Sequence, residues 1–511
     1  MTVSSQKLLI KGACIITMDP LLGILGKGDI FITDGIIREV GPTIETSDAE
    51  ILDGTNTIVM PGFVDCHRHM WQTQLRALTA DWSLYDYSAR IRSVYTSFYD
   101  PDDAYIGSYA GFLEALNAGV TTIVDHSHIM NTPDHADEVV RAFLESGMRG
   151  ILCYGMYGNA RPEEKLTPAV LMSPPWHYDD ARRIKLKYFN SDEGRVAMGI
   201  ALTEGEFFPM ELSRRELGFA REIGSKRISA HVGLGAQSKH TQYIARLERA
   251  GLMGEDILFI HGWSLTDKEL KICANHGAAV INTPETELQM GMGYPVTWRV
   301  LRCGGRTGLG IDIVSNQSAD MFTQIRLNMQ VQRALQNDRL YVAGMMPRTI
   351  TPAAYQMLEI ATIKGAESVG LAKKTGSITP GKEADIIMLR TDAINMFPVN
   401  NPVNAVIMSA NVGNIDTVMI GGQILKRNGQ LVGVDLRSVR EKIVKSQEKI
   451  IAGGAGKGFS QGESIMDNVF PLNRPMAFMV WLASMIVRSP FKKLQDIFIE
   501  RATRSVKSSR S

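Results

Sequence analysis

Residues 58–69 read Ile58-Val59-Met60-Pro61-Gly62-Phe63-Val64-Asp65-Cys66-His67-Arg68-His69, an apolar, β-branched run that ends in two histidines spaced two apart. On a β-strand this spacing places both imidazoles on the same face of the sheet. Two neutral imidazoles need only one or two further ligands to bind a divalent metal ion of borderline softness. The stretch therefore predicts part of a metal site at the end of a strand.

Three further apolar runs end in a residue that can bind a metal ion or transfer a proton. Residues 226–231 end at His231, residues 257–261 at His261 and residues 307–312 at Asp312. A single buried histidine is more often a hydrogen-bonded core residue than a metal ligand. Four such runs in one chain, separated by helical segments, favour a shared site instead.

Amphipathic segments such as residues 102–116 and 241–249 lie between the apolar runs and are followed by turn residues. Alternation of strand and helix over about 300 residues predicts a parallel β/α architecture. In a (β/α)8 barrel the functional residues lie at the carboxyl ends of the strands, which is where these histidines fall. The eight expected strands are residues 59–67, 120–125, 150–154, 196–202, 227–231, 257–261, 278–282 and 307–312.

An ordered set of motifs resembles the amidohydrolase superfamily, in particular the branch that contains cytosine deaminase, guanine deaminase and the triazine hydrolases. The resemblance spans about residues 7–435 and implies a hydrolase that acts on carbon–nitrogen bonds other than peptide bonds. Besides residues 61–69, its motifs are Ala118-Gly119-Val120-Thr121-Thr122, His231, His261-Gly262-Trp263, Gly308-Leu309-Gly310-Ile311-Asp312 and residues 376–385.

The resemblance implies that one divalent metal ion is bound by His67, His69, His231 and Asp312. Asp312 would also accept a proton from the metal-bound water and deliver it to the leaving nitrogen. His261 would orient the water or stabilise the developing oxyanion. We find no suitable lysine on the third or fourth strand to bridge two metal ions. The expected cofactor is therefore a single ion, with Zn²⁺ favoured over Fe²⁺ or Mn²⁺.

Two departures from the resemblance bear on the reaction. Deaminases of this branch carry a proton-shuttling glutamate three residues after the histidine that corresponds to His231, whereas this chain has Leu234. After the seventh strand, relatives often have Pro-x-Ser-Asn, whereas this chain reads Pro284-Glu285-Thr286-Glu287-Leu288. A leucine cannot shuttle a proton, so simple deamination is less favoured. A replacement acid would have to come from Glu204, Glu206 or Glu287.

Aromatic, amide and acidic residues near the expected strand ends are candidates for substrate binding. Flat side chains suit a flat or hydrophobic substrate, although half or more of such aromatics simply pack loops onto a barrel. A buried carboxylate would instead favour a cationic or amine-bearing substrate. The substrate-binding candidates are Trp71, Gln72, His126, Glu206, Trp263 and Glu287.

These features predict a mononuclear metal-dependent hydrolase that cleaves the C–N bond of a small cyclic amide, amidine or imine. Three alternatives remain open at this point. The first is an aminohydrolase that releases ammonia from a nitrogen heterocycle, and the second is a metal-dependent lyase or isomerase, because the same Lewis acid can polarise any carbonyl. The third is a catalytically silent structural barrel.

The segments that flank the barrel alternate apolar and polar residues around turn signals such as Thr33-Asp34-Gly35. This pattern is typical of antiparallel β-structure, and the resemblance implies that the two segments form one small β-sandwich. We therefore expect a composite β-sandwich domain, a (β/α)8 barrel and a helical C-terminal extension. Their limits are residues 1–60 with 373–437 for the sandwich, 61–372 for the barrel and 438–511 for the extension.

The C-terminal extension contains a glycine-rich stretch, residues 453–458, which we expect to be a flexible linker. Apolar residues 476–482 and a basic segment follow, which predicts an amphipathic helix. Such a helix can lie on a membrane surface, but packing against the same or a neighbouring subunit is favoured because large exposed apolar patches are rare. A homodimer is therefore expected.

Composition excludes several other classes of protein. A formal net charge of +1 over 511 residues provides no broad basic surface for nucleic acid. Five cysteines without a CxxC pair favour a reducing compartment. The chain has neither the pattern of a secretory signal nor an apolar run of about 20 residues. We expect a cytoplasmic enzyme without a transmembrane span, whose partners are a small-molecule substrate and a second copy of the chain.

Overall fold

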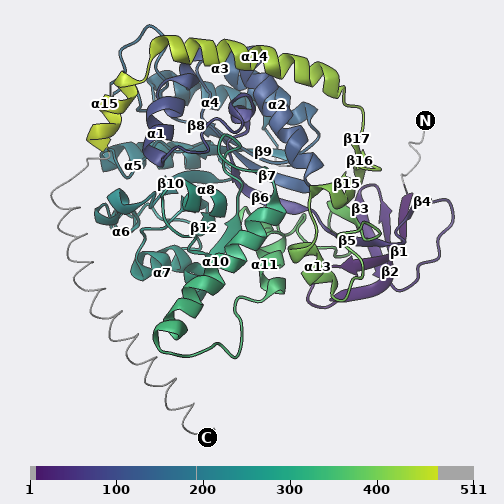
Figure 1. Ribbon diagram of the computed structural model, residues 1–511. Helices are drawn as coiled ribbons and strands as arrows, with labels where there is room; N and C mark the ends of the chain where they lie inside the picture. The colour runs from purple at the N-terminus through teal and green to yellow at the C-terminus, as the bar shows by residue number, and fades with distance from the viewer. Residues whose placement is uncertain (1–6, 168, 192, 470–511) are drawn as a thin grey trace, which may run out of the picture.

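The computed structural model describes residues 7–469, apart from residues 168 and 192 (Figure 1). Its centre is an eight-stranded parallel sheet in the order β13-β12-β11-β10-β9-β8-β7-β6. The two outer strands approach each other through a parallel bridge between Arg68 and Asp312, which closes the sheet into a barrel. The strands are β6 (Phe63–Arg68), β7 (Val120–Ser127), β8 (Arg149–Gly155), β9 (Val196–Ala201), β10 (Ile228–Val232), β11 (Ile257–His261), β12 (Ala279–Asn282) and β13 (Arg306–Leu309).

The first expected strand, residues 59–67, is divided between two sheets. β5 (Thr57–Pro61) pairs with β14 (Ile386–Arg390) outside the barrel, whereas β6 pairs with β7 inside it. Gly62 separates the two strands and lies directly against Thr121, where a Cβ atom would come within 2.1 Å of the threonine methyl group. Only glycine leaves room for the backbone to lie this close to Thr121. The apolar run leaves the second sheet and enters the barrel at this residue.

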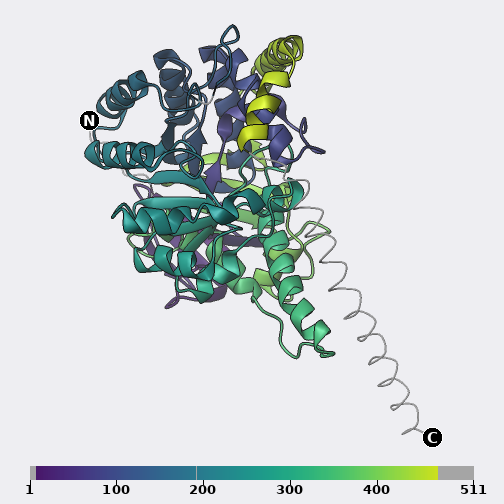
Figure 2. The ribbon, with the colours of Figure 1, turned by 90° about the vertical axis from the view of Figure 1, so that its left-hand side faces the viewer.

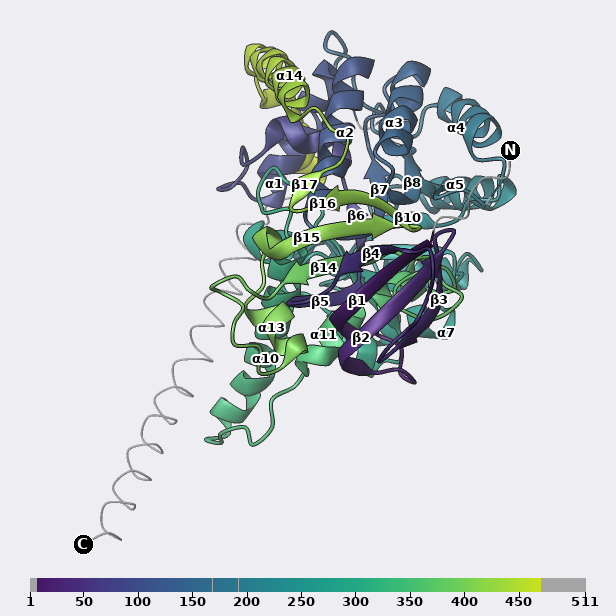
Figure 3. The ribbon, with the colours of Figure 1, turned by 90° about the vertical axis from the view of Figure 1, so that its right-hand side faces the viewer.

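The flanking segments form the second sheet, in the order β17-β16-β15-β14-β5-β1-β2-β3, with β4 paired to β1 (Figure 3). Most pairs are antiparallel, as expected, but β1 pairs with β4 and β5 in parallel. The fold class expected from the sequence is confirmed. The remaining strands are β1 (Lys7–Ile16), β2 (Ile24–Thr33), β3 (Ile36–Gly41), β4 (Glu50–Asp53), β15 (Ile415–Ile420), β16 (Gln423–Arg427) and β17 (Gln430–Leu431).

Helices surround the barrel strands on the outside (Figure 2). α2 (Pro101–Asn117) shows why they begin where they do, because Asp100 and Asp103 form a reciprocal capping box and Pro101 occupies the first helical position. The others are α3 (Pro133–Glu145), α4 (Pro175–Tyr188), α5 (Met210–Glu222), α6 (Tyr243–Arg249), α7 (Asp267–Asn275), α8 (Pro284–Gln289), α9 (Thr297–Arg302), α10 (Met321–Val342), α11 (Ala354–Ile360), α12 (Ile363–Ser368) and α13 (Pro402–Met408).

The connection from β6 to α2 is the longest loop at the carboxyl ends of the strands, and we call residues 69–100 the first loop. It contains four short helical segments instead of one extended strand-to-helix turn. Long loops in compact domains are commonly functional. The segments are η1 (Met70–Leu75), α1 (Leu84–Tyr87), the π-helix η2 (Ser88–Arg92) and η3 (Tyr95–Phe98).

The C-terminal extension contributes two helices, α14 (Leu436–Lys457) and α15 (Ser460–Val469), and α14 crosses α2 (Figure 1). The expectation of a flexible linker at residues 453–458 is wrong, because α14 continues to Lys457. Gly453 and Gly454 instead let the helix approach the rings of Phe98 and Tyr95 closely. The apolar and basic segments expected after residue 470 lie outside the described residues.

Among the residues that the structure describes, no helix is both long and apolar enough to cross a bilayer. All five cysteines are free thiols. The barrel and the second sheet are joined by a buried ion pair in which Arg149 donates to Asp385 at 2.5 Å, across the boundary between the two.

Candidate metal centre

Four side chains converge at the carboxyl ends of the barrel strands. His67 lies on β6, His69 directly follows β6, His231 lies on β10, and Asp312 lies three residues beyond the end of β13. All four are buried, with 0 to 7% of their surface exposed. The structure therefore brings together the four residues that the sequence proposed as metal ligands.

The distances between the ligand atoms match a metal site. Asp312 Oδ1 lies 3.3 Å from His67 Nε2 and 3.2 Å from His69 Nε2. His231 Nε2 lies 3.3 Å from His67 Nε2. Four ligands at about 2.0–2.1 Å from a central ion in a tetrahedron are about 3.3 Å from one another. These three distances fit one divalent ion of the size of Zn²⁺.

Hydrogen bonds on the far side of two imidazoles orient the ligand nitrogens. His69 Nδ1 lies 2.6 Å from the carbonyl oxygen of His126, so this nitrogen donates and leaves the lone pair of Nε2 free. His231 Nδ1 lies 3.0 Å from Glu204 Oε1, with the Tyr157 hydroxyl 3.2 Å away. A carboxylate behind a histidine ligand fixes its tautomer and increases its basicity, as in many metal proteins.

The electrostatics favour neutral imidazoles at His67 and His69 beside an ionised Asp312, because burial lowers the pKa of both histidines. Burial holds the pKa of His67 well below its usual range. Burial opposes ionisation of Asp312, but the neighbouring His67 and His69 outweigh it and hold the pKa of the Asp312 carboxyl well below its usual range. Metal ions bind deprotonated ligands, so the charge state of the cluster suits a cation.

His261 lies beside the four ligand residues, at the end of β11. Its ring is stacked on that of His231, with centroids 5.6 Å apart. Thr283 Oγ1 lies 3.0 Å and Glu287 Oε1 3.5 Å from His261 Nδ1, which leaves Nε2 for another partner. Burial opposes protonation of His261, but Glu287 and Asp312 outweigh it and raise its pKa.

The metal cluster opens into a small cavity of about 70 Å³, which we call the metal chamber. This is well above the roughly 10–15 Å³ that one water molecule needs. Its walls combine residues of the cluster with side chains from the first loop and from the loops after the other strands. The lining residues are His69, Leu84, Tyr87, Ser88, Arg92, His128, Glu204, His231, Leu234, His261, Thr286, Met290, Met292, Asp312 and Ile313.

Comparison with known families agrees with this fold. The model of the amidohydrolase family matches residues 58–425. The chain belongs to the amidohydrolase family. The superfamily, the fold and the class of enzyme expected from the sequence, a hydrolase acting on carbon–nitrogen bonds, are thereby confirmed.

Two curated relatives match this amidohydrolase over most of both chains. The 5-methylthioadenosine/S-adenosylhomocysteine deaminase of Desulforudis audaxviator is 28% identical over 461 residues, which cover 87% of this chain and 99% of the relative. The protein of the same name from Pyrococcus furiosus is 26% identical over 449 residues, which cover 86% and 99%.

Solved structures share the fold. An adenosine deaminase of Xanthomonas campestris with bound zinc superimposes with a TM-score of 0.76 at 22% identity, covering 88% of this amidohydrolase and 99% of that chain. An atrazine chlorohydrolase of Arthrobacter aurescens complexed with zinc gives a TM-score of 0.75 at 21% identity, covering 86% and 100%. The likeness shows the fold, and both of these proteins are described with zinc.

The six substrate-binding candidates of this amidohydrolase do not line the metal chamber. Trp71 is fully buried and packs edge-on against Tyr99, with ring centroids 5.1 Å apart. Gln72 donates to the Tyr87 hydroxyl at 2.5 Å and thus supports a lining residue from behind. His126 lies behind the ligands and is 2.9 Å from Ser229 Oγ.

The other three candidates support loops. Trp263 packs edge-on against Tyr294, with centroids 5.2 Å apart. Glu206 accepts hydrogen bonds from the backbone of Gly233 and the hydroxyl of Ser238, so it holds the segment after β10. Glu287 is fully buried beside His261 and accepts from the backbone of Thr283 at 2.8 Å.

Sequence patterns do not identify several of the residues that line the chamber. Glu204 was one of three possible acids, and among these glutamates it alone reaches the chamber. His128 has two ring nitrogens without a hydrogen-bond partner and stacks on His69 at 4.1 Å. Tyr87 and Arg92 come from the first loop, where no regular pattern marks them. The Asp125-His126-Ser127-His128 motif was the available signal, but it did not show which histidine faces the chamber.

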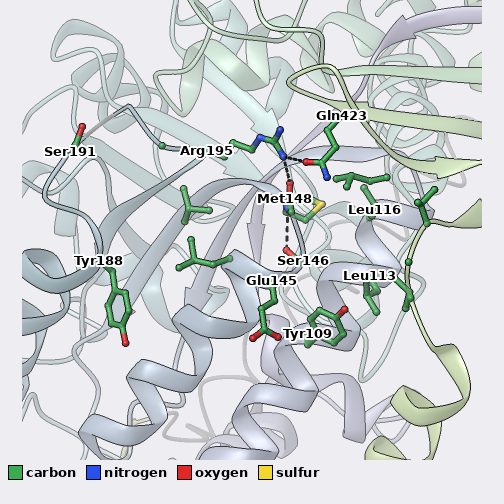
Figure 4. Close-up of a pocket in the computed structure, with 18 of the residues that line it drawn as sticks. Tyr109, Leu113, Leu116, Glu145, Ser146, Met148, Tyr188, Ser191, Arg195 and Gln423 are labelled. Carbon is green, nitrogen blue, oxygen red and sulfur yellow. Dashed lines mark hydrogen bonds between the residues drawn. The ribbon is translucent and has the colours of Figure 1, made fainter. Parts of the chain in front are cut away.

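A larger groove of about 660 Å³ lies at the amino ends of the strands (Figure 4). Arg195, just before β9, spans it and donates to Gln423 at 2.9 Å. Active sites of (β/α)8 barrels lie at the opposite, carboxyl ends of the strands. The groove also lacks every ligand residue, so it is not the candidate catalytic site.

Proposed function

We propose that the protein is a mononuclear metal-dependent aminohydrolase that removes an amino group from a small nitrogen heterocycle and releases ammonia. The observation that carries this proposal is a buried cluster beside a cavity, in which Asp312 Oδ1 lies 3.2–3.3 Å from the Nε2 atoms of His67 and His69, and His231 Nε2 lies 3.3 Å from His67 Nε2. The names of the curated relatives, which are deaminases, support the reaction. We further propose zinc as the ion, and a cytoplasmic homodimer as the working form.

When bound, a divalent ion supplies the Lewis acidity that makes a water molecule nucleophilic near neutral pH. Asp312 is ionised and buried, so it can accept the proton of the attacking water. His261 has its Nδ1 engaged by Thr283 and can therefore use Nε2 to orient that water or stabilise the developing negative charge.

Glu204 is the best candidate for the second proton transfer. Its Oε1 is hydrogen-bonded to His231, whereas Oε2 is buried without a partner and the residue lines the metal chamber. A carboxylate oxygen there can exchange a proton with a ring nitrogen of the substrate. Glu204 thus supplies, from the loop after β9, the function that Leu234 cannot perform.

A second candidate function is hydrolytic opening of a cyclic amide, amidine or imine. Leu234 favours it, because this apolar side chain forms the wall where the resemblance expects an acid. Ring opening needs proton transfer only to the leaving ring nitrogen, for which Asp312 is sufficient.

The test is incubation of the metal-loaded protein with a panel of aminated heterocycles, including adenosine-type nucleosides, and of cyclic amides. Release of one ammonia per turnover, with replacement of the amino group by oxygen in the mass spectrum, would support the aminohydrolase. Addition of one water without ammonia would favour ring opening. A product that contains neither change would contradict both and point to lyase or isomerase chemistry.

A further inference from the structure

A second cavity adjoins the metal chamber, and we call it the side chamber. Its volume is about 100 Å³. The two chambers share four wall residues, namely Ser88, Arg92, Glu204 and Leu234. A substrate bound at the metal ligands can therefore extend past these residues into the side chamber.

The walls that belong only to the side chamber are largely apolar. Leu171, Phe207, Phe208 and Met466 contribute to them, from three separate parts of the chain. Pockets lined by aliphatic and aromatic side chains bind apolar groups, because burial removes apolar surface of both partners from water. The side chamber thus suits an apolar arm, whereas the metal chamber is lined by histidines and carboxylates.

Arg92 places a positive charge at the junction of the two chambers. Its Nη1 donates to Asn159 Oδ1 at 3.3 Å, and the guanidinium carbon lies 5.1 Å from the centre of the Tyr157 ring. Among the described residues no carboxylate lies within ion-pair distance of Arg92, although many other arginines of the chain have such a partner. The Glu204 carboxylate of the shared wall acts electrostatically on Arg92 but forms no ion pair with it. An anionic ligand group can therefore still accept charge-assisted hydrogen bonds from the guanidinium.

The C-terminal extension holds this part of the site in place. Met466 of α15 is itself a wall residue. The Tyr85 hydroxyl lies 3.1 Å from the carbonyl oxygen of Glu463 and 2.8 Å from Asp467 Oδ1. Gly462 passes so close to Ala89 that a Cβ atom would lie 1.9 Å from the alanine carbonyl oxygen. α15 therefore fixes η2, the segment that carries Ser88 and Arg92.

We propose that the side chamber is the specificity subsite of the enzyme: it takes an apolar arm of the substrate, Arg92 binds an anionic group of the same molecule, and α15 completes the wall. This inference rests on the proposed function for the position of the reacting group. It identifies the substrate class as an extended molecule with a reactive C–N bond, a carboxylate or similar anion, and an apolar substituent.

The test is equilibrium binding of three probes to the full-length, metal-loaded protein by ligand-detected NMR titration. Phenylbutyrate carries both features, butyrate lacks the apolar group and phenylbutyramide lacks the charge. We expect phenylbutyrate to bind at least about tenfold more tightly than either of the others, since a charge-assisted hydrogen bond and a buried ring each contribute more than the 1.4 kcal/mol that a factor of ten represents.

Variants distinguish the subsite from binding of the carboxylate at the metal ion. Arg92→Met should weaken phenylbutyrate at least about tenfold, bringing it close to phenylbutyramide, and Arg92→Lys should restore part of the loss. Met466→Trp and, independently, Leu171→Trp should weaken both phenyl compounds by filling the chamber. The matched controls are Arg215→Met, which removes another arginine stacked on a tyrosine, and Met408→Trp on the exposed face of α13.

Equal affinity of the three probes for the wild type, no detectable binding of phenylbutyrate, or unchanged binding in Arg92→Met would overturn the proposal. A loss of the same size in the control variants would also overturn it. These readouts need no turnover. If the probes bind as expected but no heterocycle is hydrolysed, the proposed function fails and the subsite stands. If a heterocycle is hydrolysed but the probes do not show the expected pattern of affinities, the subsite fails and the proposed function stands.

Discussion

At the scale of single residues, the site contains two side chains on strained backbone. His261 has a φ of 78° and Asp312 a φ of 72°, both in the left-handed region that favours glycine. Such conformations persist where surrounding contacts impose them, and they gather at functional sites. The Asp312 N–H donates to the carbonyl oxygen of His67 at 2.9 Å, and Asp312 in turn accepts from the N–H of His69 at 2.7 Å. These bonds hold the carboxylate against His67 and His69 at the end of β6.

The residue scale also shows how far motifs predict a site. The four ligand candidates converge because each lies at or just beyond the carboxyl end of a strand, and these ends of a parallel barrel meet at one edge. Trp71 and Gln72 are predicted to bind substrate because they lie close to His69 in the sequence. They lie on η1, a 3-10 helix that turns both side chains into the protein core. Nearness in sequence does not determine side-chain direction once the chain leaves the strand.

Glu204→Gln tests the hydrogen bond behind His231. The substitution removes the negatively charged acceptor of the His231 Nδ1–H hydrogen bond. We therefore expect metal affinity to fall by about 10–100-fold, as is typical when a residue that supports a metal ligand is replaced. Competition with a chelator of known affinity measures the change. Glu206→Gln is the matched control, because that glutamate is buried nearby but contacts none of the ligand residues. Equal losses in the two variants would contradict the assigned role.

At the scale of secondary-structure elements, the barrel strands were predictable and the loops were not. All eight expected strands occur within a few residues of their predicted limits, because short apolar runs bounded by turns mark them. The exception is the division at Gly62, which depends on contact with Thr121. The four segments of the first loop depend on contacts with distant parts of the chain, including α15, and sequence patterns do not encode such contacts locally.

Glu206, in the loop after β9, accepts hydrogen bonds from the segment after β10, and its ionisation predicts how stability depends on pH. Burial raises the pKa of Glu206 from about 4.5 to about 7. The folded state therefore binds this proton more tightly than the unfolded state does. The resulting contribution to the free energy of unfolding has its full size below about pH 4.5 and is lost as the pH rises through about 7. The melting temperature of the wild type should therefore fall relative to that of Glu206→Gln as the pH rises from about 5 to about 8. Parallel melting curves over this range would exclude the effect.

At the scale of the whole molecule, the barrel carries the site and the C-terminal extension contributes one wall residue to it. We propose the division expected from the sequence: a β-domain from residues 1–60 and 373–437, a barrel from 61–372 and an extension from 438–511. The family match ends at residue 425, so α14 and α15 lie beyond it. Ser446 on α14 donates to Asp103 at 2.6 Å, and α15 packs on η2. The sequence predicted a helical extension but not its contact with the site, because periodicity does not identify the partner of a helix.

Two alanine substitutions in α14 test the packing of the extension. Alanine in a helix is ordinarily more stable than glycine by about 1 kcal/mol. At Gly454 the new Cβ would lie 2.3 Å from the Tyr95 ring, so Gly454→Ala should destabilise by about 1–3 kcal/mol. At Gly456 nothing lies within 4 Å, so Gly456→Ala should stabilise. Melting temperatures that shift in the same direction would contradict the close packing.

The most direct test of the account is the metal content per chain of protein that has been stripped with a chelator, reloaded with zinc and desalted. The account predicts about one ion in the wild type and near-complete loss in His67→Ala and in Asp312→Ala, with His126→Ala, behind the ligands, retaining most of it. Two ions per chain would contradict the mononuclear site. Absence of bound metal from the reloaded wild type, or equal retention in the two ligand variants, would contradict the metal centre itself.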